Sequence, residues 1–371
     1  MKIAYVYPEK LPDRKARAIS ALNTVKALGK LADTAILYEK SASKELFQKT
    51  DGIKEIRVGK EFLGIKSNKI FNFNLMRTLK KEKVDIFYVR HLKAAKFLLK
   101  EKPKNSKLIF ECHEIFSKAN EKIYPLEKFV YENSDALTFI NATLSEEISK
   151  SFDLSGIPKM IVDNGCGFDL EYEEKDFANL DSLFYAGNFY PWKGVDFLIR
   201  SLKKIDGITL RIAGSGEREE TLKALVNELG LEKRVAFLGQ KSHDEIRHIM
   251  RTNRLAVIPN TPSRYNHYST PIKLYEYLAS SNIVIAPNMP TIQEIVVDGE
   301  NGFLFKTGDM DSFVDTLRRV LATPPDRLRE ISHSAYITSK NYTWEKRAEK
   351  IVELANSLLD SKNQSKDRKP L

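Results

Sequence analysis

The segment SLFYAGNFYPWKGVDFLIR, residues 182–200, shows how the second half of the chain is built. Its apolar and aromatic start predicts a short strand that ends at Ala186, after which Gly187 opens a turn and a helical pattern begins near Gly194. A buried strand, a glycine turn and a helix in this order are the repeating unit of a parallel sheet covered by helices. The segment therefore predicts an α/β fold.

Similar strand-like runs alternate with helical patterns over most of the chain. A first series holds IAYVY, a helix over residues 16–31, and then TAILY, DIFYVR, KLIFEC, ALTFIN and MIVDN. A second series opens at residue 182 and continues through ITLRIAG, RVAFLG, LAVIP and NIVIAP. Because 371 residues exceed the size at which one core keeps growing, we predict two doubly wound, Rossmann-like domains. Ligands of such domains bind beyond the carboxyl ends of the strands.

The boundary between the domains is expected near residue 168. The segment NGCGFDLEYEEKDFANLD, residues 164–181, is acidic, contains two glycines and has weak periodicity, which is typical of an exposed linker. A last helix is expected after the second domain, and the polar tail that follows it has too little apolar surface to fold. The predicted parts are residues 1–168, 169–342, the helix 343–360 and a disordered tail, 361–371.

Charge is distributed unevenly along the chain. The whole chain has 60 Lys and Arg against 50 Asp and Glu, but residues 1–110 alone hold 26 basic and 11 acidic residues. Such a basic half suits nucleic acid, anionic lipid or a phosphorylated acceptor, because each offers dense negative charge. It also suits a solvated, lysine-rich surface. Charge alone leaves these alternatives open.

Composition indicates a protein that does not span a membrane. The chain is 42% hydrophobic and 30% charged, and it lacks the roughly 20 uninterrupted apolar residues of a membrane-spanning helix. Because it starts with MKIAYVYPEK and shows no apolar leader, we expect a cytoplasmic location. Its two cysteines, Cys112 and Cys166, are too few for a disulfide framework or for a zinc site built from cysteines.

The stretch FLGIKSNKIFNFNLMRTLKKEK, residues 62–83, mixes apolar and aromatic residues with lysines. This combination is typical of an amphipathic helix that lies on an anionic membrane surface. An ordinary domain helix with its apolar face in the core fits the same pattern equally well. The sequence leaves both alternatives open.

The turn that opens at Gly187 carries a candidate anion site. Lys193 stands just before the start of the following helix. A helix N-terminus beside a lysine favours a diphosphate through its dipole, its free N–H groups and the ammonium charge. For this motif on its own, a solvated lysine at a helix start is the simpler alternative.

The segment RYNHYSTPIKLYEYLASSNIVIAP, residues 264–287, carries a second candidate site. Thr270 is expected to cap a helix whose first residue is Pro271, so that the helix amides face a ligand. Glu276, in the second turn, could bind a sugar hydroxyl, as acidic residues do for ribose. Lys273 could bind phosphate, or it could form an ion pair with Glu276.

A third glycine turn follows the strand ITLRIAG. Gly214, Ser215 and Gly216 open a helix, which fits either the close approach of a ligand to the backbone or a plain tight turn. The third glycine of the dinucleotide fingerprint and its acidic ribose partner are missing, so a nicotinamide enzyme fits poorly. No metal constellation occurs in the sequence, and Asp309 and Asp311 fit the capped start of a helix.

In the first half of the chain, KLIFECHEIF places His113 where a strand meets its following loop. A histidine at a carboxyl strand end could donate a hydrogen bond to a reacting group or orient a second substrate. Taken singly, each of the six histidines is more often structural than catalytic.

Together these segments resemble the retaining family-4 glycosyltransferases, which share the GT-B fold. YAGNFYPWKGVDFLI is similar to the family's glycine-to-lysine diphosphate turn, LRIAGSGE to its middle strand and loop, and TPIKLYEYLASSNIVIAP to its donor helix. YTWEKRAEKIVELA resembles the long final helix that crosses back onto the first domain. The first half matches more loosely, through VYP, ECHE and VDNGCGFD. The resemblance implies two Rossmann-like domains that face a central cleft.

The resemblance also implies roles for single residues. Glu276 would bind the donor ribose, Lys193 the diphosphate, and His113 the transferred sugar near the reaction centre, so that these three are the candidate catalytic residues. The amides of residues 270–272 would hold the β-phosphate. The candidate donor-binding residues are Gly187, Asn188, Lys193, Gly214, Thr270, Pro271, Ile272, Lys273 and Glu276.

Two positions depart from the family's pattern. The family usually has an arginine just after the turn glycine, where this chain has Asn188, so the diphosphate charge must be met otherwise, for example by Lys273. Many members have a glutamate eight residues before the ribose carboxylate, where this chain has Tyr268. The second departure leaves open which sugar hydroxyls the site reads.

By this resemblance the chain is expected to be a retaining, metal-independent glycosyltransferase. The expected donor is a UDP- or GDP-sugar, and no cofactor is expected. The acceptor would be a glycan or lipid-linked molecule of cell-surface polysaccharide or lipopolysaccharide biosynthesis, and the basic first domain would contact the anionic inner membrane. A nucleic-acid partner is not expected, because no RNA-binding signature occurs. The alternatives are a nucleotide-sugar epimerase or hydrolase on the same fold, and a non-enzymatic basic protein that binds membrane or nucleic acid.

Overall fold

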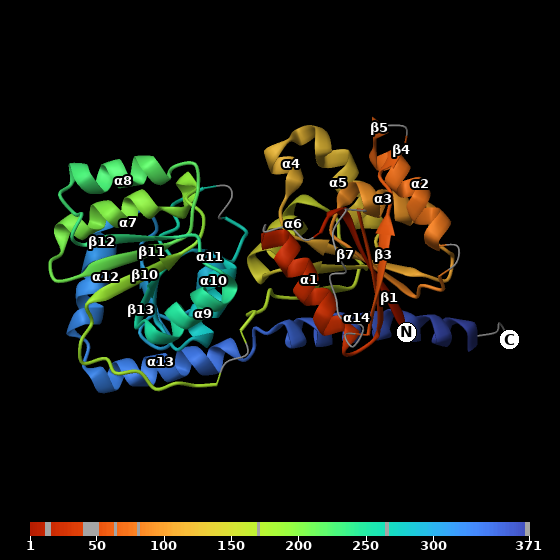
Figure 1. The fold of residues 1–371 in the computed structure, drawn as a ribbon. Coiled ribbons are helices and arrows are strands. Elements are labelled where there is room, and N and C mark those ends of the chain that lie inside the picture. Colours follow the sequence, from red (N-terminus) through yellow and green to blue (C-terminus); the bar gives the residue numbers. More distant parts are fainter. Residues whose placement is uncertain are drawn as a thin grey trace. The chain divides into compact units, whose positions relative to one another are not determined.

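The computed structural model describes residues 1–11, 16–39, 52–62, 65–79, 82–168, 171–263 and 267–367. The chain forms two compact units (Figure 1). Unit 1 consists of Met1–Gly165 together with Trp344–Leu371, and unit 2 consists of Cys166–Thr343. The final helix is therefore part of the same unit as the first half of the chain.

Unit 1 is built on a parallel sheet whose strand order, over its described residues, is β3-β2-β1-β6-β7-β8-β9. Its strands are β1 (Lys2–Lys10), β2 (Asp33–Glu39), β3 (Ile53–Val58), β6 (Ile86–Val89), β7 (Lys107–Cys112), β8 (Ala136–Phe139) and β9 (Lys159–Ile161). Its helices are α1 (Ala16–Gly29), α2 (Asn68–Leu79), α3 (Leu92–Glu101), α4 (Phe116–Ala119), α5 (Tyr124–Asn133), α6 (Ala142–Ser151) and α14 (Trp344–Asp367). A short antiparallel pair, β4 (Glu61–Phe62) and β5 (Ile65–Lys66), precedes α2.

Unit 2 contains a second parallel sheet, with the order β12-β11-β10-β13-β14-β15 over its described residues. Its strands are β10 (Ser182–Ala186), β11 (Thr209–Ala213), β12 (Val235–Gly239), β13 (Leu255–Val257), β14 (Ile283–Pro287) and β15 (Phe303–Phe305). Its helices are α7 (Val195–Ser201), α8 (Glu219–Glu228), α9 (His243–Thr252), α10 (Ile272–Ala279), α11 (Pro290–Gln293), α12 (Met310–Ala322) and α13 (Pro325–Ser339). The predicted strand end at Ala186 is confirmed.

In both sheets the strand order reverses beside the first strand of the unit. β1 pairs with β2 on one side and with β6 on the other, and β10 pairs with β11 and with β13. Open α/β sheets bind ligands at the carboxyl ends of strands where the order reverses in this way. The predicted doubly wound α/β fold is confirmed, and it places the residues that follow β1, β6, β10 and β13 at such points.

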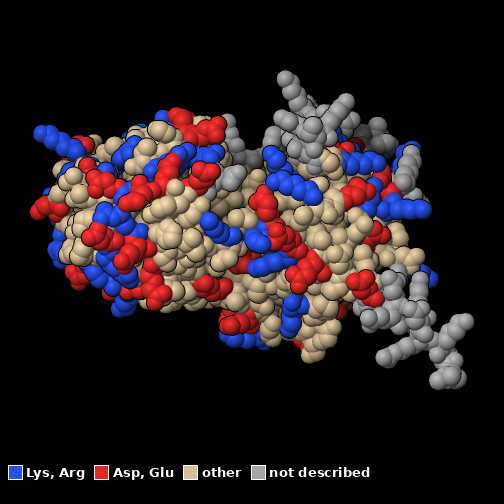
Figure 2. Space-filling model, turned by 90° about the horizontal axis from the view of Figure 1, so that it is seen from below, with Lys and Arg blue, Asp and Glu red and all other residues tan. Residues whose placement is uncertain are grey.

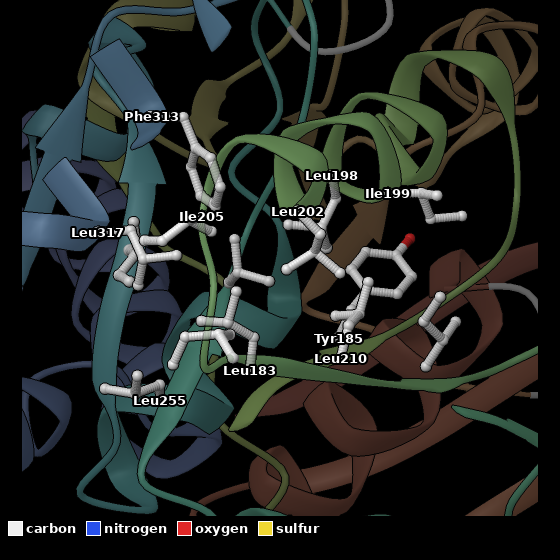
Figure 3. Close-up of a cluster of buried hydrophobic side chains, with 14 of the residues drawn as sticks. Leu183, Tyr185, Leu198, Ile199, Leu202, Ile205, Leu210, Leu255, Phe313 and Leu317 are labelled. Carbon is white, nitrogen blue, oxygen red and sulfur yellow. The ribbon is translucent and has the colours of Figure 1, made fainter. Parts of the chain in front are cut away.

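The core of unit 2 explains why residues 182–200 form strand, turn and helix. Leu183 and Tyr185 share one face of β10 and pack in a cluster with Leu198 of α7 (Figure 3). Phe184 and Ala186 lie on the opposite face and join a second buried cluster. Because both faces are buried, the strand is a continuous apolar run and does not alternate with polar residues. Each large side chain buried in this way stabilises the fold by about 1.5–3 kcal/mol.

Helix α14 packs against unit 1 through one apolar face. Residues spaced three or four apart are buried in one cluster with α1 and β1, as expected for an amphipathic helix. These residues are Trp344, Ala348, Ile351, Ala355 and Leu358. The helix continues to Asp367, so the predicted disordered tail is wrong for residues 361–367, because extending an existing helix needs no new nucleus. Residues 368–371 lie outside the described residues.

The prediction of an exposed linker is wrong for Lys175 and Phe177. Lys175 is 8% exposed and Phe177 is 2% exposed, and Phe177 belongs to the core of unit 2. The Lys175 ammonium donates to the carbonyl oxygen of Met250 at 3.0 Å and to the Oδ1 of Asn282 at 3.2 Å. Contacts with residues this distant in the sequence cannot be predicted from a local acidic composition. The segment therefore folds as part of unit 2, which begins at Cys166.

Helix α2 is a domain helix with its apolar face in the core, which confirms one of the two alternatives for residues 62–83. Its buried residues are Phe71, Leu75 and Leu79. A second series of residues four apart is exposed: Lys69, Phe73 and Arg77. Residues 63–64 and 80–81 of this stretch lie outside the described residues. Over the part of the chain that the structure describes, no helix has both the length and the apolar character to cross a membrane.

The surface carries both signs of charge. On the face drawn in Figure 2, Lys and Arg side chains are interspersed with Asp and Glu and form no single basic area. Ion pairs account for part of this mixing, for example Lys2 with Glu82 at 2.6 Å in unit 1. The basic excess of residues 1–110 therefore does not form one basic area on this face.

Candidate functional site

Two glycine turns of unit 2 touch each other at the ends of β10 and β11. The Gly187 N–H donates to the carbonyl oxygen of Ala213 at 2.9 Å, and the Gly214 N–H donates to that of Gly239 at 2.9 Å. Gly214 has a φ of +142°, and a Cβ at this position would overlap the carbonyl group of Gly187. Both the backbone conformation and the space therefore require glycine. The neighbouring turn thus explains the glycine at position 214, and the alternative of a ligand close to this backbone stays a prediction.

We expect Gly214→Ala to destabilise unit 2 by roughly 2–4 kcal/mol, because it adds backbone strain to a steric overlap. Gly230→Ala is the matched control, since Gly230 also has a positive φ, +65°, but nothing lies within 4 Å of its Cβ position. The control should cost only about 1–2 kcal/mol. Urea unfolding of the purified variants measures both values. Equal losses would show that the contact between the turns does not matter.

Lys193 ends a single 3-10 turn, Pro191–Lys193, that connects β10 to α7. Gly194 follows in the left-handed region at a φ of +69°, and a Cβ there would overlap the carbonyl group of Pro259, which follows β13. The turn is thereby fixed against the loop after β13. Burial lowers the pKa of Lys193. A buried lysine whose charge is costly unless it is compensated is suited to bind an anion.

Lys273, on α10, points its ammonium at the Gly187 turn. Its Nζ lies 3.9 Å from the centroid of the Tyr185 ring and 2.5 Å from the position that a Cβ on Gly187 would take. The ammonium is buried and has no hydrogen-bond partner among the described residues. Burial, and next the charge of Lys193, hold the pKa of Lys273 well below its usual range. The structure thus presents two neighbouring lysines that form no ion pair with a described residue.

Glu276 lies one turn further along α10. Within the described residues no ion pair joins it to Lys273, so the alternative of a simple Lys273–Glu276 pair is wrong for this structure. Burial raises the pKa of the Glu276 carboxyl to about 7, although the charge of Lys273 opposes the shift. An acidic group with this pKa is a candidate for a binding or catalytic role. Its position fits a carboxylate that accepts hydrogen bonds from ligand hydroxyls.

The start of α10 differs from the sequence expectation. The helix begins at Ile272 and its N-cap is Pro271, at a ψ of 126°. The Thr270 hydroxyl donates to the carbonyl oxygen of Thr291 at 3.4 Å. Proline has no amide hydrogen, so the expected donation from the Pro271 amide is wrong. The amides of Ile272 and Lys273, in the first turn, have no acceptor inside the helix and remain available for a ligand.

The two departures from the family's pattern lie beside this cluster. Asn188 is exposed, and its carbonyl oxygen accepts a hydrogen bond from the Tyr185 hydroxyl at 2.9 Å. Tyr268 packs edge-on against the ring of His267, with 4.5 Å between ring centroids. Asn188 adds no charge, whereas Lys273 places an ammonium at the same turn. The cluster in unit 2 thus consists of the Gly187 and Gly214 turns, Lys193, Lys273, Glu276 and the start of α10.

His113 belongs to unit 1, directly after β7, and is held by a buried charged group. The His113 Nε2 lies 2.5 Å from the Oε1 of Glu111, which also accepts a hydrogen bond from Arg347 of α14. The Arg347 guanidinium further donates to the Oγ1 of Thr24 and to the carbonyl oxygen of Asp163, both at 2.9 Å. Although burial opposes ionisation, the Arg347 charge holds the pKa of Glu111 far below its usual range. The Glu111–Arg347 pair therefore fixes the histidine.

The hydrogen bond to Glu111 decides which role the His113 ring can take. Burial, and next the charge of Arg90, lower the pKa of His113 to about 4, so the ring is neutral. Ionised Glu111 can only accept, so the hydrogen sits on Nε2 and Nδ1 is left as an acceptor. His113 can therefore accept a hydrogen bond from a hydroxyl, and the donating role suggested by the sequence does not fit this arrangement.

His113 also lines a pocket of about 580 Å³ that lies within unit 1. Residues at the ends of three neighbouring strands contribute to it: Glu9 of β1, Arg90 and His91 after β6, and His113 after β7. Arg90 and His91 were not predicted as site residues, although they follow the strand run DIFYV as His113 follows KLIFEC. Arg347 could not be predicted, because nothing local distinguishes a buried arginine of an amphipathic helix from an exposed one.

The acidic pair after residue 308 is structural, as predicted. The Asp309 carboxylate caps α12 by accepting a hydrogen bond from the Ser312 N–H at 3.0 Å. Asp311 is exposed and pairs with Lys204 on the surface. Across the described residues, no group of three or more histidines, cysteines and carboxylates is arranged to hold a metal ion.

Comparison with known proteins finds a family model that matches part of unit 2. Residues 171–338 match the model of the glycosyl transferases group 1. An uncharacterized glycosyltransferase of Methanocaldococcus jannaschii is 26% identical over 59% of this chain and 58% of its own length. The D-inositol 3-phosphate glycosyltransferase of Mycolicibacterium smegmatis is 29% identical over 40% of this chain and 34% of its own length. The matches thus span less than two thirds of either relative.

A solved structure extends the comparison of the fold to both units. The structure of Anabaena HepE in complex with UDP superposes with a TM-score of 0.79, covering 96% of this chain and 100% of HepE at 17% identity. A likeness at this identity establishes the fold, which is the GT-B fold that the sequence led us to expect. Residues 171–338 are thus similar to the glycosyl transferases group 1.

Proposed function

We propose that this chain is a retaining glycosyltransferase that moves a sugar from a nucleotide-diphosphate sugar to a glycan or lipid-linked acceptor. The observation that carries the proposal is the buried Lys273 ammonium, which points at the Gly187 turn without a hydrogen-bond partner among the described residues. A buried charge is retained only where something compensates it. A diphosphate at the Gly187 turn would compensate Lys273 and Lys193 together.

The surroundings of these lysines fit the rest of a nucleotide donor. Free amides at the start of α10 and the dipole of the helix favour a phosphate group. The Glu276 carboxylate would accept hydrogen bonds from ribose hydroxyls, as acidic residues do in other nucleotide sites. HepE, which has the same fold, was solved with UDP. We therefore propose a UDP- or GDP-sugar as donor, with the nucleotide bound in unit 2.

The proposed chemistry needs no metal ion. The bond between the anomeric carbon and the β-phosphate oxygen breaks, and the acceptor oxygen bonds to the same face of the sugar, which retains its configuration. The leaving phosphate takes the acceptor proton. Lys193 and the amides of α10 would stabilise the negative charge that develops on this phosphate. His113, with Nδ1 as acceptor, would orient an acceptor hydroxyl in the pocket of unit 1.

We further propose that the protein acts in the cytoplasm, in peripheral contact with the anionic inner membrane, on acceptors of cell-surface polysaccharide or lipopolysaccharide synthesis. Support comes from α2, whose exposed residues Lys69, Phe73 and Arg77 are spaced four apart. Phe73 is 69% exposed between these two cations. Cations beside an exposed aromatic ring are typical of helices that touch anionic lipid.

A thermal-shift panel with UDP, GDP, ADP and TDP tests the donor site. We expect one nucleotide to stabilise the protein by about 2.7 kcal/mol at roughly 100 times its Kd. Glu276→Ala should lose most of this gain, because it removes the ribose contact. Removing a carboxyl whose ionisation is opposed by burial should not unfold the protein. Melting curves with and without each nucleotide give the result.

Glu300→Ala is the control for this panel, because Glu300 is an exposed carboxylate of unit 2 that does not belong to the glycine turns or to α10. It should respond to the nucleotide like the wild type. Absence of a shift with all four nucleotides, or an unchanged shift in Glu276→Ala, would contradict the proposed donor site. A donor that is consumed without any acceptor would favour an epimerase or hydrolase instead.

A further inference from the structure

The pocket of unit 1 has the position of a substrate site. It is formed at the carboxyl ends of β1, β6 and β7, beside the point where the strand order of the sheet reverses. Its volume of about 580 Å³ lies in the range of sites that enclose small molecules. His113, for which we propose a role toward the acceptor, is in its wall. The pocket is thus the place in unit 1 where an acceptor group would bind.

The charges of the lining show an excess of cations. Two acidic side chains line the pocket, Glu9 and Glu114. Four basic side chains also line it: Arg17, Lys60, Arg90 and Lys93. Glu9 is already engaged, because it pairs with Arg17 at 2.9 Å and with His91 at 3.1 Å. Lys60 pairs with Glu39 at 3.0 Å. Arg90 and Lys93 form no ion pair with any described residue.

Arg90 is the cation placed to act inside the pocket. It is half-buried, and among described residues its guanidinium donates only to the carbonyl oxygen of Arg17, at 3.4 Å. Burial lowers the pKa values of His91 and His113, and the charge of Arg90 lowers both further, so its field reaches both histidines of the wall. A guanidinium has five donors in a planar fork that matches phosphate oxygens. Most of these donors are unused here.

The two histidines add groups that suit hydroxyls. The Nε2 of His91 lies 3.1 Å from the Oε1 of Glu9, and its buried Nδ1 has no hydrogen-bond partner in the described part of the chain. Because a carboxylate only accepts, the hydrogen of a neutral His91 ring sits on Nε2, and Nδ1 is an acceptor. The Nδ1 of His113 is an acceptor for the same reason. The pocket therefore combines unpaired cations with acceptors for O–H groups.

We propose that the acceptor is a phosphorylated, hydroxyl-bearing molecule, whose phosphate binds Arg90 with the help of Lys93 while its hydroxyls face His91 and His113. This inference rests on the proposed function, but it concerns the acceptor and not the nucleotide-sugar donor. A free sugar phosphate and the phosphate of a lipid headgroup share this chemistry. A pocket of limited volume favours either of them over an extended nucleic acid.

Calorimetry with glucose 6-phosphate tests the proposal. The donor site is first filled with the nucleotide that the thermal-shift panel identifies, because Lys193 and Lys273 would also attract phosphate. Wild-type protein should then bind glucose 6-phosphate and bind glucose far more weakly. Arg90→Gln should weaken the binding of glucose 6-phosphate at least about tenfold, as expected for a lost hydrogen-bonded charge.

Lys96→Gln is the matched control, because Lys96 is exposed on the same helix as Lys93 and does not line the pocket. It should bind glucose 6-phosphate like the wild type. If Arg90→Gln does not fold, Lys93→Gln replaces it, since Lys93 is exposed and its loss leaves no buried group. Nucleotide affinity should be the same in all variants. If the wild type binds no nucleotide, that result would instead refute the proposed donor site.

Vesicles separate the two sources of phosphate. Phosphatidylcholine vesicles with and without phosphatidic acid are sedimented with wild type and Arg90→Gln. Binding that requires both phosphatidic acid and Arg90, without binding of glucose 6-phosphate, assigns the site to a lipid headgroup. Binding of glucose 6-phosphate without binding of phosphatidic acid vesicles assigns the site to a free sugar phosphate. The proposal is overturned if neither probe binds, or if Arg90→Gln and Lys96→Gln behave alike.

Discussion

Replacing Lys193 with alanine is expected to lower turnover by more than tenfold and to leave the fold intact. The ammonium would stabilise the negative charge that develops on the leaving diphosphate, and single groups of this kind contribute about 100-fold or more to catalysis. Lys193 forms no ion pair with a described residue, and burial opposes its charge. The variant should therefore melt at or above the wild-type temperature. Steady-state rates with the donor identified by the nucleotide panel measure the effect.

Lys223→Ala serves as the control for Lys193→Ala. Lys223 is in the same unit, and its pairs with Glu219 and Glu220 are surface contacts that contribute little to stability. It should keep wild-type turnover. A Lys193→Ala enzyme with a rate near that of the wild type would rule out the proposed role of this lysine in catalysis.

Replacing Arg347 with methionine is expected to destabilise unit 1 by about 3–5 kcal/mol, because it leaves the buried Glu111 carboxylate without its cation. Arg347 is 2% exposed and Glu111 is 1% exposed, so water cannot compensate the loss. The same change should raise the pKa of His113, since the Arg347 charge lowers it in the wild type. Urea unfolding measures the stability, and NMR titration of the histidine measures its pKa.

Two further variants separate the lost charge from the lost side chain. Adding Glu111→Gln to Arg347→Met removes the unpaired carboxylate and should restore part of the stability. Lys346→Met, at an exposed neighbouring position of α14, should change stability by no more than about 1 kcal/mol. Equal stability of Arg347→Met and Lys346→Met would show that the buried pair does not hold unit 1 together.

The Glu111–Arg347 pair also predicts how stability depends on pH. The pKa of Glu111 is lower in the folded protein than its ordinary value of 4.5. Its contribution is therefore complete above about pH 4.5 and is lost as the pH falls below that value. The double variant, which lacks the carboxylate, should lose less stability than the wild type over this acidic range.

Much of the fold could be predicted because it is written in short local patterns. Continuous apolar runs such as SLFYA become strands that are buried on both faces, and the spacing of Trp344, Ala348 and Ile351 predicts the face of α14. Lys175 was wrongly predicted to be exposed, because its burial depends on oxygens of Met250 and Asn282, far along the chain. Local composition contains no information about such partners.

For the candidate site too, some features follow from local sequence and others from contacts between distant segments. By itself, the sequence determined the two α/β domains, the glycine turns at Gly187 and Gly214, and the positions of Lys193 and Glu276 near helix starts, because strand ends and helix starts are set by local residues. Only the tertiary structure decided that Lys273 does not pair with Glu276, that Arg347 holds Glu111 and His113, and that Arg90 faces a pocket. These outcomes depend on which side chains of distant segments share a buried space, where an unpaired charge is costly.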